Sequence, residues 1–129
     1  MIPIETKGAP LPSGPYSQAV LSGNTVYVSG LIPTAPADRT IPEGTEDQIR
    51  MVMRNVLSVL SAAGVERGHV LKVNVYLTDM NDFALMNSVY KETFCDPYPA
   101  RTCIGVNSLP KGVKIMVDAV GELHRSNAD

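Results

Sequence analysis

Hydrophobic and polar positions along this chain recur with clear periods, and these periods predict strands and helices in alternation. Residues 14–30, GPYSQAVLSGNTVYVSG, contain turn residues between two apolar runs, which is typical of two strands joined by a turn at residues 22–24. In the second run Val26 and Val28 face one way, and Tyr27 and Ser29 face the other. The proline-rich residues 33–44 then predict an irregular loop.

The next segment has helical spacing. Thr45 and Gln48 have the spacing of a capping box, in which two N-terminal amides are satisfied reciprocally, so we expect a helix to begin at Thr45. Its apolar stripe comprises Ile49, Val52, Met53, Val56, Leu60 and Ala63. Gly64 stands where a left-handed C-terminal cap would end the helix.

Strict alternation follows in residues 70–77, VLKVNVYL, and predicts a strand. Its apolar face would carry Leu71, Val73, Val75 and Leu77, and its polar face Lys72, Asn74 and Tyr76. A second helix is expected from residue 80 or 81 to residue 94, capped by Asp79 or Asn81 and ended by Pro97 and Pro99. Its buried stripe would be Phe83, Met86, Tyr90 and Phe94. Two strands, 101–106 and 113–122, close the chain.

The predicted order is therefore β-β-α-β-α-β-β, an α/β fold with a mixed sheet. The strand–helix–strand units resemble crossovers, and the first and last strand pairs resemble hairpins. Because there are only two helices, we expect them to cover one face of the sheet. The other face, with Tyr27, Lys72, Asn74 and Tyr76, would meet solvent or a second copy of the chain, and we favour the second copy.

Composition excludes several classes of protein. The chain has 129 residues, which suits one domain over residues 1–129, and its net charge of -2 does not favour nucleic acid or an anionic membrane. No apolar run approaches the roughly 18–20 residues of a spanning helix. Two cysteines are too few for a disulfide framework. We expect a cytoplasmic protein, or a mitochondrial one if a presequence has been removed.

Arg101 is the main candidate for chemistry. It follows two prolines in DPYPARTCIG, and alternation places Arg101, Cys103 and Gly105 on one face of a strand. A planar guanidinium beside two small residues suits bidentate binding of a carboxylate ligand. The alternative is a structural ion pair of Arg101 with Asp118 or Asp96. Spacing leaves both interpretations open.

Several motifs resemble the RidA/YjgF family of reactive-intermediate deaminases, which is also labelled endoribonuclease L-PSP and translation inhibitor. They are GPYSQAV, VYVSG, LTDMNDFALMNSVYKETF and YPARTCIGVNSLPKGVKIMVDAV, and they span most of the chain. The resemblance implies a chorismate-mutase-like fold with two helices on a six-stranded sheet, and a homotrimeric barrel with clefts between subunits. It also implies hydrolysis of small 2-imino acids, or their enamines, to 2-oxo acids and ammonia without a metal or organic cofactor.

The resemblance further implies roles for particular residues. Arg101 would clamp the substrate carboxylate, and the backbone of Cys103 would help to hold the imine nitrogen and the water. Tyr16 and Ser29 would line the pocket, and Gly30 would let the backbone approach the substrate closely.

Asn87 would be a polar group near the cleft, and Asp118 would orient or activate the attacking water. Asp118 departs from the family, which has glutamate there, and so its carboxylate is one methylene shorter. Leu31 stands where glutamine is common, which makes the pocket more apolar.

Two other functions stay open at this stage. The chain could be a non-catalytic protein that binds a small carboxylate or acts as a chaperone-like partner, and the shorter Asp118 favours that alternative. A ribonuclease is the least favoured, since there is no basic stripe and no histidine pair in an acid–base arrangement. His69 and His124 match no functional position and are expected to be surface residues.

Overall fold

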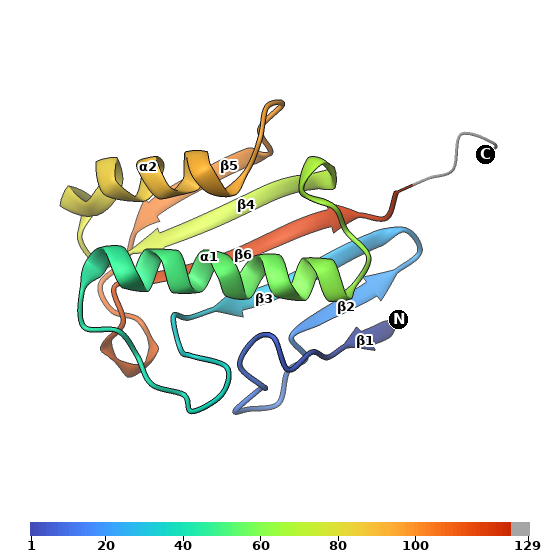
Figure 1. Ribbon diagram of the computed structural model, residues 1–129, viewed down its shortest axis with the longest axis horizontal. Helices are drawn as coiled ribbons and strands as arrows, with labels where there is room; N and C mark the ends of the chain where they lie inside the picture. Colours follow the sequence, from blue (N-terminus) through green and yellow to red (C-terminus); the bar gives the residue numbers. More distant parts are fainter. Residues whose placement is uncertain (125–129) are drawn as a thin grey trace.

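The computed structural model describes residues 1–124 and contains one sheet and two long helices (Figure 1). The strands are β1 Ile2–Ile4, β2 Ala19–Ser22, β3 Thr25–Leu31, β4 Val70–Leu77, β5 Ala100–Gly105 and β6 Ile115–Glu122. The helices are α1 Thr45–Ala62 and α2 Phe83–Thr93, and short 3-10 turns occupy Arg67–His69, Met80–Asp82 and Pro110–Gly112. Neither long helix has the length and apolar composition needed to cross a membrane, within the residues described.

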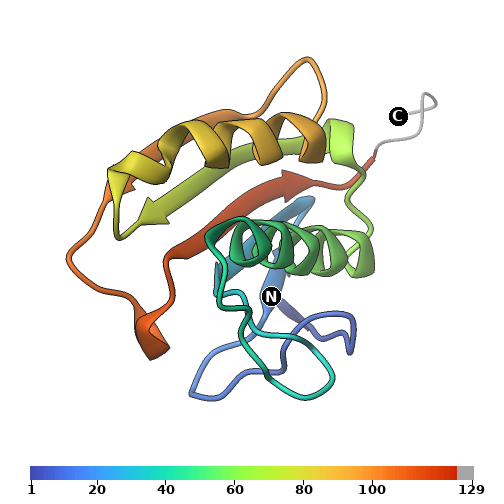
Figure 2. The ribbon, with the colours of Figure 1, turned by 60° about the vertical axis from the view of Figure 1, so that its left-hand side comes forward.

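The six strands form one mixed sheet in the order β1-β2-β3-β6-β4-β5. Only β4 and β5 pair in parallel, and the other neighbours are antiparallel. Both helices lie on the same face of the sheet, with α1 over the middle strands and α2 beside β4 and β5 (Figures 1 and 2). The predicted mixed sheet with two helices on one face is therefore confirmed.

Two features of the topology differ from what the periodicity predicts. A short first strand, Ile2–Ile4, pairs with β2, although three residues interrupted by Pro3 carry too little alternation to be recognised. The last two strands do not form a hairpin. β6 lies between β3 and β4, where strands on both sides satisfy its backbone, and β5 lies at the edge beside β4.

The core lies between the sheet and the helices. It contains the inward strand residues Val26, Val28, Val73, Val75, Leu77, Ile115, Val117 and Ala119. The helices contribute Ile49, Val52, Met53, Val56, Leu60, Met86 and Tyr90, and Phe94 follows directly after α2. Two predicted core residues are exposed instead. The pairing of β4 shifts between Val70 and Lys72, so Val70 is buried and Leu71 is 44% exposed. Phe83, in the first turn of α2, is 37% exposed.

The capping box predicted at Thr45 is wrong. Gly44 is the N-cap of α1 and provides no side-chain hydrogen bond. Gln48 is buried, and it joins two loops: its Nε2 donates to the Pro42 carbonyl at 2.8 Å, and its Oε1 accepts from the Lys114 amide at 2.9 Å. The predicted C-terminal cap is confirmed, since Gly64 has a φ of +91°.

Gln18 fixes the N-terminal segment against the sheet. Its side chain is almost fully buried, and its Oε1 accepts from the Thr6 amide at 2.7 Å. Its Nε2 donates to the carbonyls of Thr6, Ala9 and Pro10 at 2.8–3.2 Å. One side chain therefore satisfies the polar backbone of a segment that has little regular structure.

Replacement of Gln18 by leucine should lower the free energy of unfolding by about 2–5 kcal/mol, because several buried backbone groups lose their partner. Urea denaturation measures this change. The matched control is Ser17→Ala, since the Ser17 side chain makes no hydrogen bond within residues 1–124. Equal stability of Gln18→Leu and Ser17→Ala would contradict the anchoring role.

Candidate active site

Arg101 lies on the edge strand β5 and points toward α2. Its Nη1 donates to Asn87 Oδ1 at 2.7 Å. Its guanidinium carbon lies 4.7 Å from the centre of the Tyr90 ring and 5.6 Å from that of Phe83. Phe83, Asn87 and Tyr90 share one face of α2, so the helix provides two aromatic rings and one hydrogen-bond acceptor for this cation.

Arg101 has no carboxylate partner within residues 1–124, where the ion pairs are Arg50 with Glu46 and Glu92, and His69 with Glu66. The alternative of a structural ion pair with Asp118 or Asp96 is therefore wrong. Asp118 is out of reach because β4 lies between β5 and β6. Nη1 donates to Asn87 Oδ1 and contacts Met86 Sδ at 3.9 Å. Nε and Nη2 have no hydrogen-bond partner within residues 1–124 and can bind a ligand.

A hollow of about 410 Å³ opens beside this guanidinium. It is lined by Asn87, Tyr90, Lys91, Tyr98, Pro99 and Arg101. The Tyr90 hydroxyl is buried without a hydrogen-bond partner among the residues described, and its burial raises the pKa of Tyr90 to about 12. Two cations beside aromatic walls suit a small anion with an apolar part.

Cys103 follows Arg101 on the same side of β5. Its side chain is partly buried against the core. Burial raises the pKa of the Cys103 thiol, and the nearby charge of Arg101 opposes this only in part. The thiol is therefore protonated at neutral pH, which makes it a poor nucleophile. Because β5 is an edge strand, some of its backbone groups are free to contact a ligand.

Asp118 lies on the opposite face of the sheet, which neither α1 nor α2 covers (Figures 1 and 2). Both of its oxygens accept hydrogen bonds: Oδ1 from Asn74 Nδ2 at 2.8 Å, and Oδ2 from the Tyr76 hydroxyl at 2.9 Å. The bond to Asp118 is the main cause that raises the pKa of Tyr76, so this phenol stays a donor near neutral pH. Asp118 is thus held in a defined orientation.

Tyr16, Ser29 and Gly30 form a third group. Ser29 Oγ donates to the Ser17 carbonyl at 2.6 Å, and Tyr16 is 49% exposed. A Cβ atom on Gly30 would lie 2.8 Å from Met116 Sδ, so only glycine fits at this position without displacing Met116. Tyr16 and Gly30 line one small hollow of about 40 Å³ together with Lys111, among other residues.

One chain therefore brings Arg101 and Asn87 together, and Tyr16 and Gly30 together, but it does not join these groups to each other or to Asp118. The periodicity missed the support that Phe83 and Tyr90 give to Arg101. The spacing of residues 83, 87 and 90 is the signal that could have indicated it, since these positions share one helix face. The alternation predicts the correct face for Asn74 and Tyr76, but it does not predict that they donate hydrogen bonds to Asp118.

Comparison with known proteins agrees with this structure. The family model described as Endoribonuclease L-PSP matches residues 6–123. A RutC family protein of Pyrococcus horikoshii is 48% identical over 118 residues, which are 91% of this chain and 94% of that protein. The 2-iminobutanoate/2-iminopropanoate deaminase of Bos taurus is 40% identical, over 91% of this chain and 86% of its own length.

Solved structures share the fold. The crystal structure of Escherichia coli TdcF with bound serine has a TM-score of 0.91 and 40% identity, covering 98% of this chain and 100% of that one. RidA from the Antarctic bacterium Psychrobacter has a TM-score of 0.90 and 40% identity, covering 93% and 98%. The chain therefore belongs to the family described as Endoribonuclease L-PSP, which is the RidA/YjgF family that the sequence motifs indicate.

Proposed function

We propose that this protein hydrolyses small 2-imino acids to 2-oxo acids and ammonia. The observation that carries this proposal is the guanidinium of Arg101, which has no carboxylate partner among residues 1–124 and lies at a hollow with aromatic walls. The bovine relative is named for deamination of 2-iminobutanoate and 2-iminopropanoate, and TdcF was crystallised with serine, a small amino acid.

Arg101 would bind the substrate carboxylate. Its contacts with Tyr90, Phe83 and Asn87 restrict the guanidinium before the ligand arrives, so little side-chain entropy is lost on binding. Each charge-assisted hydrogen bond in such a sheltered site contributes about 1.5–3 kcal/mol. The aromatic walls would accept the short apolar side chain of the imino acid.

Hydrolysis then needs a positioned water and a group that moves protons. The water oxygen bonds to C2 of the imino acid while the π electrons of C=N move to nitrogen, which takes up a proton. The carbinolamine hydroxyl then loses its proton as C=O forms, and the C–N bond breaks with its electron pair leaving on nitrogen as ammonia. Asp118 would relay both protons: it would accept one from the attacking water and pass it to nitrogen, and then accept one from the carbinolamine hydroxyl and pass it to the leaving nitrogen.

The complete site would form between copies of the chain. Arg101 and Asp118 lie on opposite faces of one sheet, so a substrate that contacts both must take them from different copies. The uncovered face also exposes Tyr27 and Ile104, which favours burial against another copy. A homotrimer with clefts between subunits meets both requirements.

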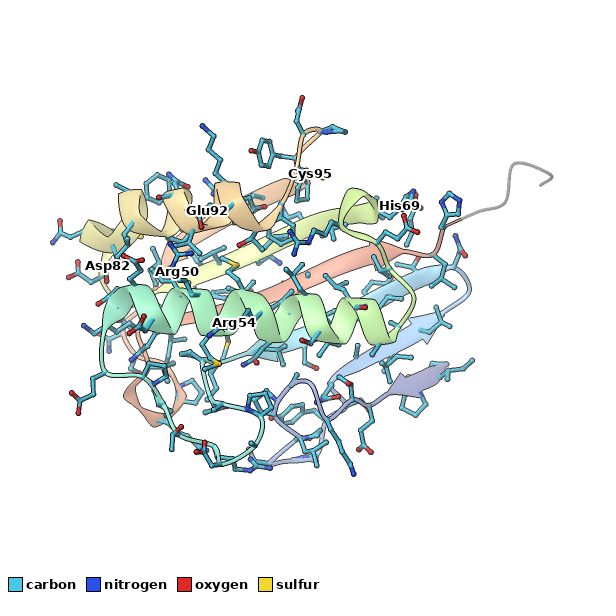
Figure 3. The ribbon with its side chains drawn as sticks, in the orientation of Figure 1. Arg50, Arg54, His69, Asp82, Glu92 and Cys95 are labelled. Atoms are coloured by element: carbon cyan, nitrogen blue, oxygen red, sulfur yellow. The ribbon has the colours of Figure 1, made fainter. Side chains whose placement is uncertain are left out.

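A non-catalytic carboxylate-binding protein is the second candidate. It is favoured by the hydrogen bonds from Asn74 and Tyr76, which already occupy both oxygens of Asp118. A ribonuclease has less support. Arg50 is paired with Glu46 of the same helix and with Glu92 of α2. Figure 3 labels Arg50 and Glu92 on these two neighbouring helices. Neither histidine lines the hollow beside Arg101.

Arg101→Ala should lower the rate of imine hydrolysis by about 10²–10⁴-fold, because two charge-assisted hydrogen bonds are lost. Arg101→Lys should recover only a small part, since an ammonium cannot form the planar fork. An amino-acid oxidase would generate the imines, and semicarbazide would trap those that survive.

The matched control is Lys91→Ala, which removes the other cation of the hollow and should have a smaller effect. Unaltered hydrolysis in Arg101→Ala would contradict the proposed role. Absence of activity in the wild-type protein, together with saturable binding of a 2-oxo acid that Arg101→Ala abolishes, would identify the binding protein instead.

Cys103→Ala should keep most of the activity, because burial holds the thiol in its protonated form and the proposed role belongs to the backbone. In the wild-type protein, iodoacetamide should alkylate the exposed Cys95 well before Cys103 at pH 8, as peptide mass spectrometry would show. Alkylation of Cys103 should accelerate only at a higher pH than for an ordinary thiol. Fast alkylation of Cys103 with parallel loss of activity would contradict this assignment.

Complementation tests whether the site forms between copies. Arg101→Ala and Asp118→Ala should each be inactive alone, whereas co-refolding of equal amounts should restore about a quarter of the wild-type rate, since that share of sites receives both intact residues. Size-exclusion chromatography would verify assembly of each variant. No recovery in assembled mixtures would show that Arg101 and Asp118 do not meet across an interface.

A further inference from the structure

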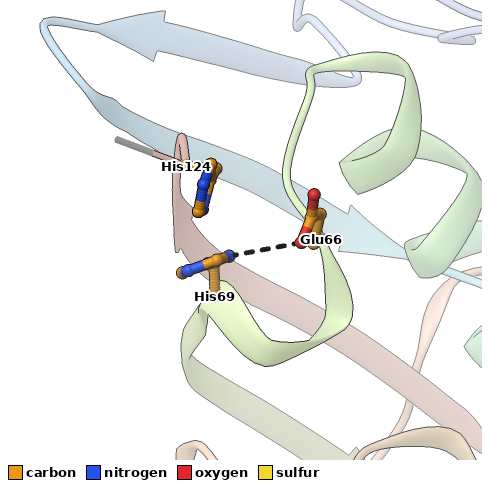
Figure 4. Close-up of side chains that lie close together, drawn as sticks. All are labelled: Glu66, His69 and His124. Carbon is orange, nitrogen blue, oxygen red and sulfur yellow. Dashed lines mark ion pairs between the residues drawn. The ribbon is translucent and has the colours of Figure 1, made fainter. Parts of the chain in front are cut away.

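A cluster of metal-ligating side chains lies outside the candidate active site. Glu66, His69 and His124 lie close together (Figure 4), and each offers one ligand atom within 4.8 Å of those of the other two. Glu66 Oε2 is 3.9 Å from His69 Nδ1, and the centres of the two imidazole rings are 5.0 Å apart. None of the three residues lines the hollow beside Arg101.

The fold builds this cluster from distant parts of the chain. Glu66 and His69 belong to the turn between α1 and β4, and His124 follows β6. Antiparallel pairing of Val70 with Gly121 brings the two segments together. Gly121 allows the turn to approach closely, since a Cβ atom there would lie only 2.7 Å from Val65 Cγ1 and 3.4 Å from the His69 carbonyl oxygen.

His69 has an unsatisfied atom in this cluster. Its Nδ1 is buried and has no hydrogen-bond partner within residues 1–124, and the 3.9 Å to Glu66 is too long for a hydrogen bond. Leaving a buried polar nitrogen without a partner costs folding free energy, because its hydration is lost and nothing replaces it. A group that enters between Glu66 and the two imidazoles would remove this cost.

We propose that Glu66, His69 and His124 bind a divalent transition-metal ion of the Zn²⁺ type. Imidazole nitrogens favour Zn²⁺, Ni²⁺ or Cu²⁺ over Mg²⁺ and Ca²⁺, which prefer oxygen ligands throughout. Two imidazoles and one carboxylate supply three ligands of a tetrahedral site and leave one position for water.

Binding needs only a modest contraction of the cluster. Zn²⁺ bonds to nitrogen and oxygen at about 2.0–2.2 Å, which places the ligand atoms roughly 3.3 Å from each other. The side chain of Glu66 is 72% exposed and His124 is exposed, so both can turn toward His69 without disturbing the core. The ion would tie the end of β6 to the turn that precedes β4, and it would stabilise the fold rather than take part in imine hydrolysis.

The test uses the full chain without an affinity tag, after removal of metals with EDTA. Isothermal titration with ZnCl₂ should show one ion per chain, with a dissociation constant of about 10 µM or tighter. Co²⁺ should give the intense visible absorption of a tetrahedral site. His69→Ala and His124→Ala should each weaken Zn²⁺ binding at least tenfold, and Glu66→Gln should weaken it less.

Two matched controls separate this cluster from other ligands of the chain. Cys95→Ser removes the exposed thiol and Glu43→Gln removes an exposed carboxylate elsewhere, and neither should change the affinity. Zn²⁺ should also raise the melting temperature of the wild-type protein by about 2–4 °C and leave that of His124→Ala unchanged. His69→Gln provides a less disruptive variant if the alanine variant does not fold.

Equal Zn²⁺ affinity in the wild-type, His69→Gln and His124→Ala proteins would overturn the proposal, as would the absence of saturable binding at about 100 µM Zn²⁺. If His69→Gln lowers stability equally with and without Zn²⁺, the cluster is an ion pair of Glu66 with His69 and not a metal site.

Discussion

The insertion of β6 between β3 and β4 is the pairing on which the rest of this structure depends. It joins the N-terminal strands to the strand–helix–strand units in one continuous sheet. Its inward residues Ile115, Val117 and Ala119 complete the core beneath α1, and both of its edges are satisfied by antiparallel neighbours. The same insertion moves β5 to the edge of the sheet, so β5 and β6 are not paired with each other.

This arrangement separates the two charged groups of the candidate active site. Arg101 stands on the edge strand and lies against the aromatic rings of α2, while Asp118 lies on the uncovered face of β6 with both of its oxygens hydrogen-bonded. Neither can neutralise the other within one chain. A cation that has no carboxylate partner among residues 1–124 and an oriented carboxylate are therefore both left for the proposed ligand and the proposed neighbouring copy.

β6 also creates the histidine cluster. Its pairing with β4 places His124 beside the turn that carries Glu66 and His69, and Gly121 leaves room for that turn. The cluster and the hollow beside Arg101 involve different side chains, so binding at one can be altered without removing residues of the other. The sheet thus carries two separate candidate sites on one small framework.

The sequence by itself determined the helices, five of the six strands, and most of the core, because period-2 and period-3.6 burial is a local property of the chain. It also indicated the family and singled out Arg101, since motifs are local too. Only the tertiary structure decided the neighbours of β5 and β6 and the hydrogen bonds of Gln18 and Gln48. It also decided the contacts of Arg101 with two aromatic rings and the proximity of His69 to His124. These depend on pairing between segments far apart in the chain, which periodicity does not encode.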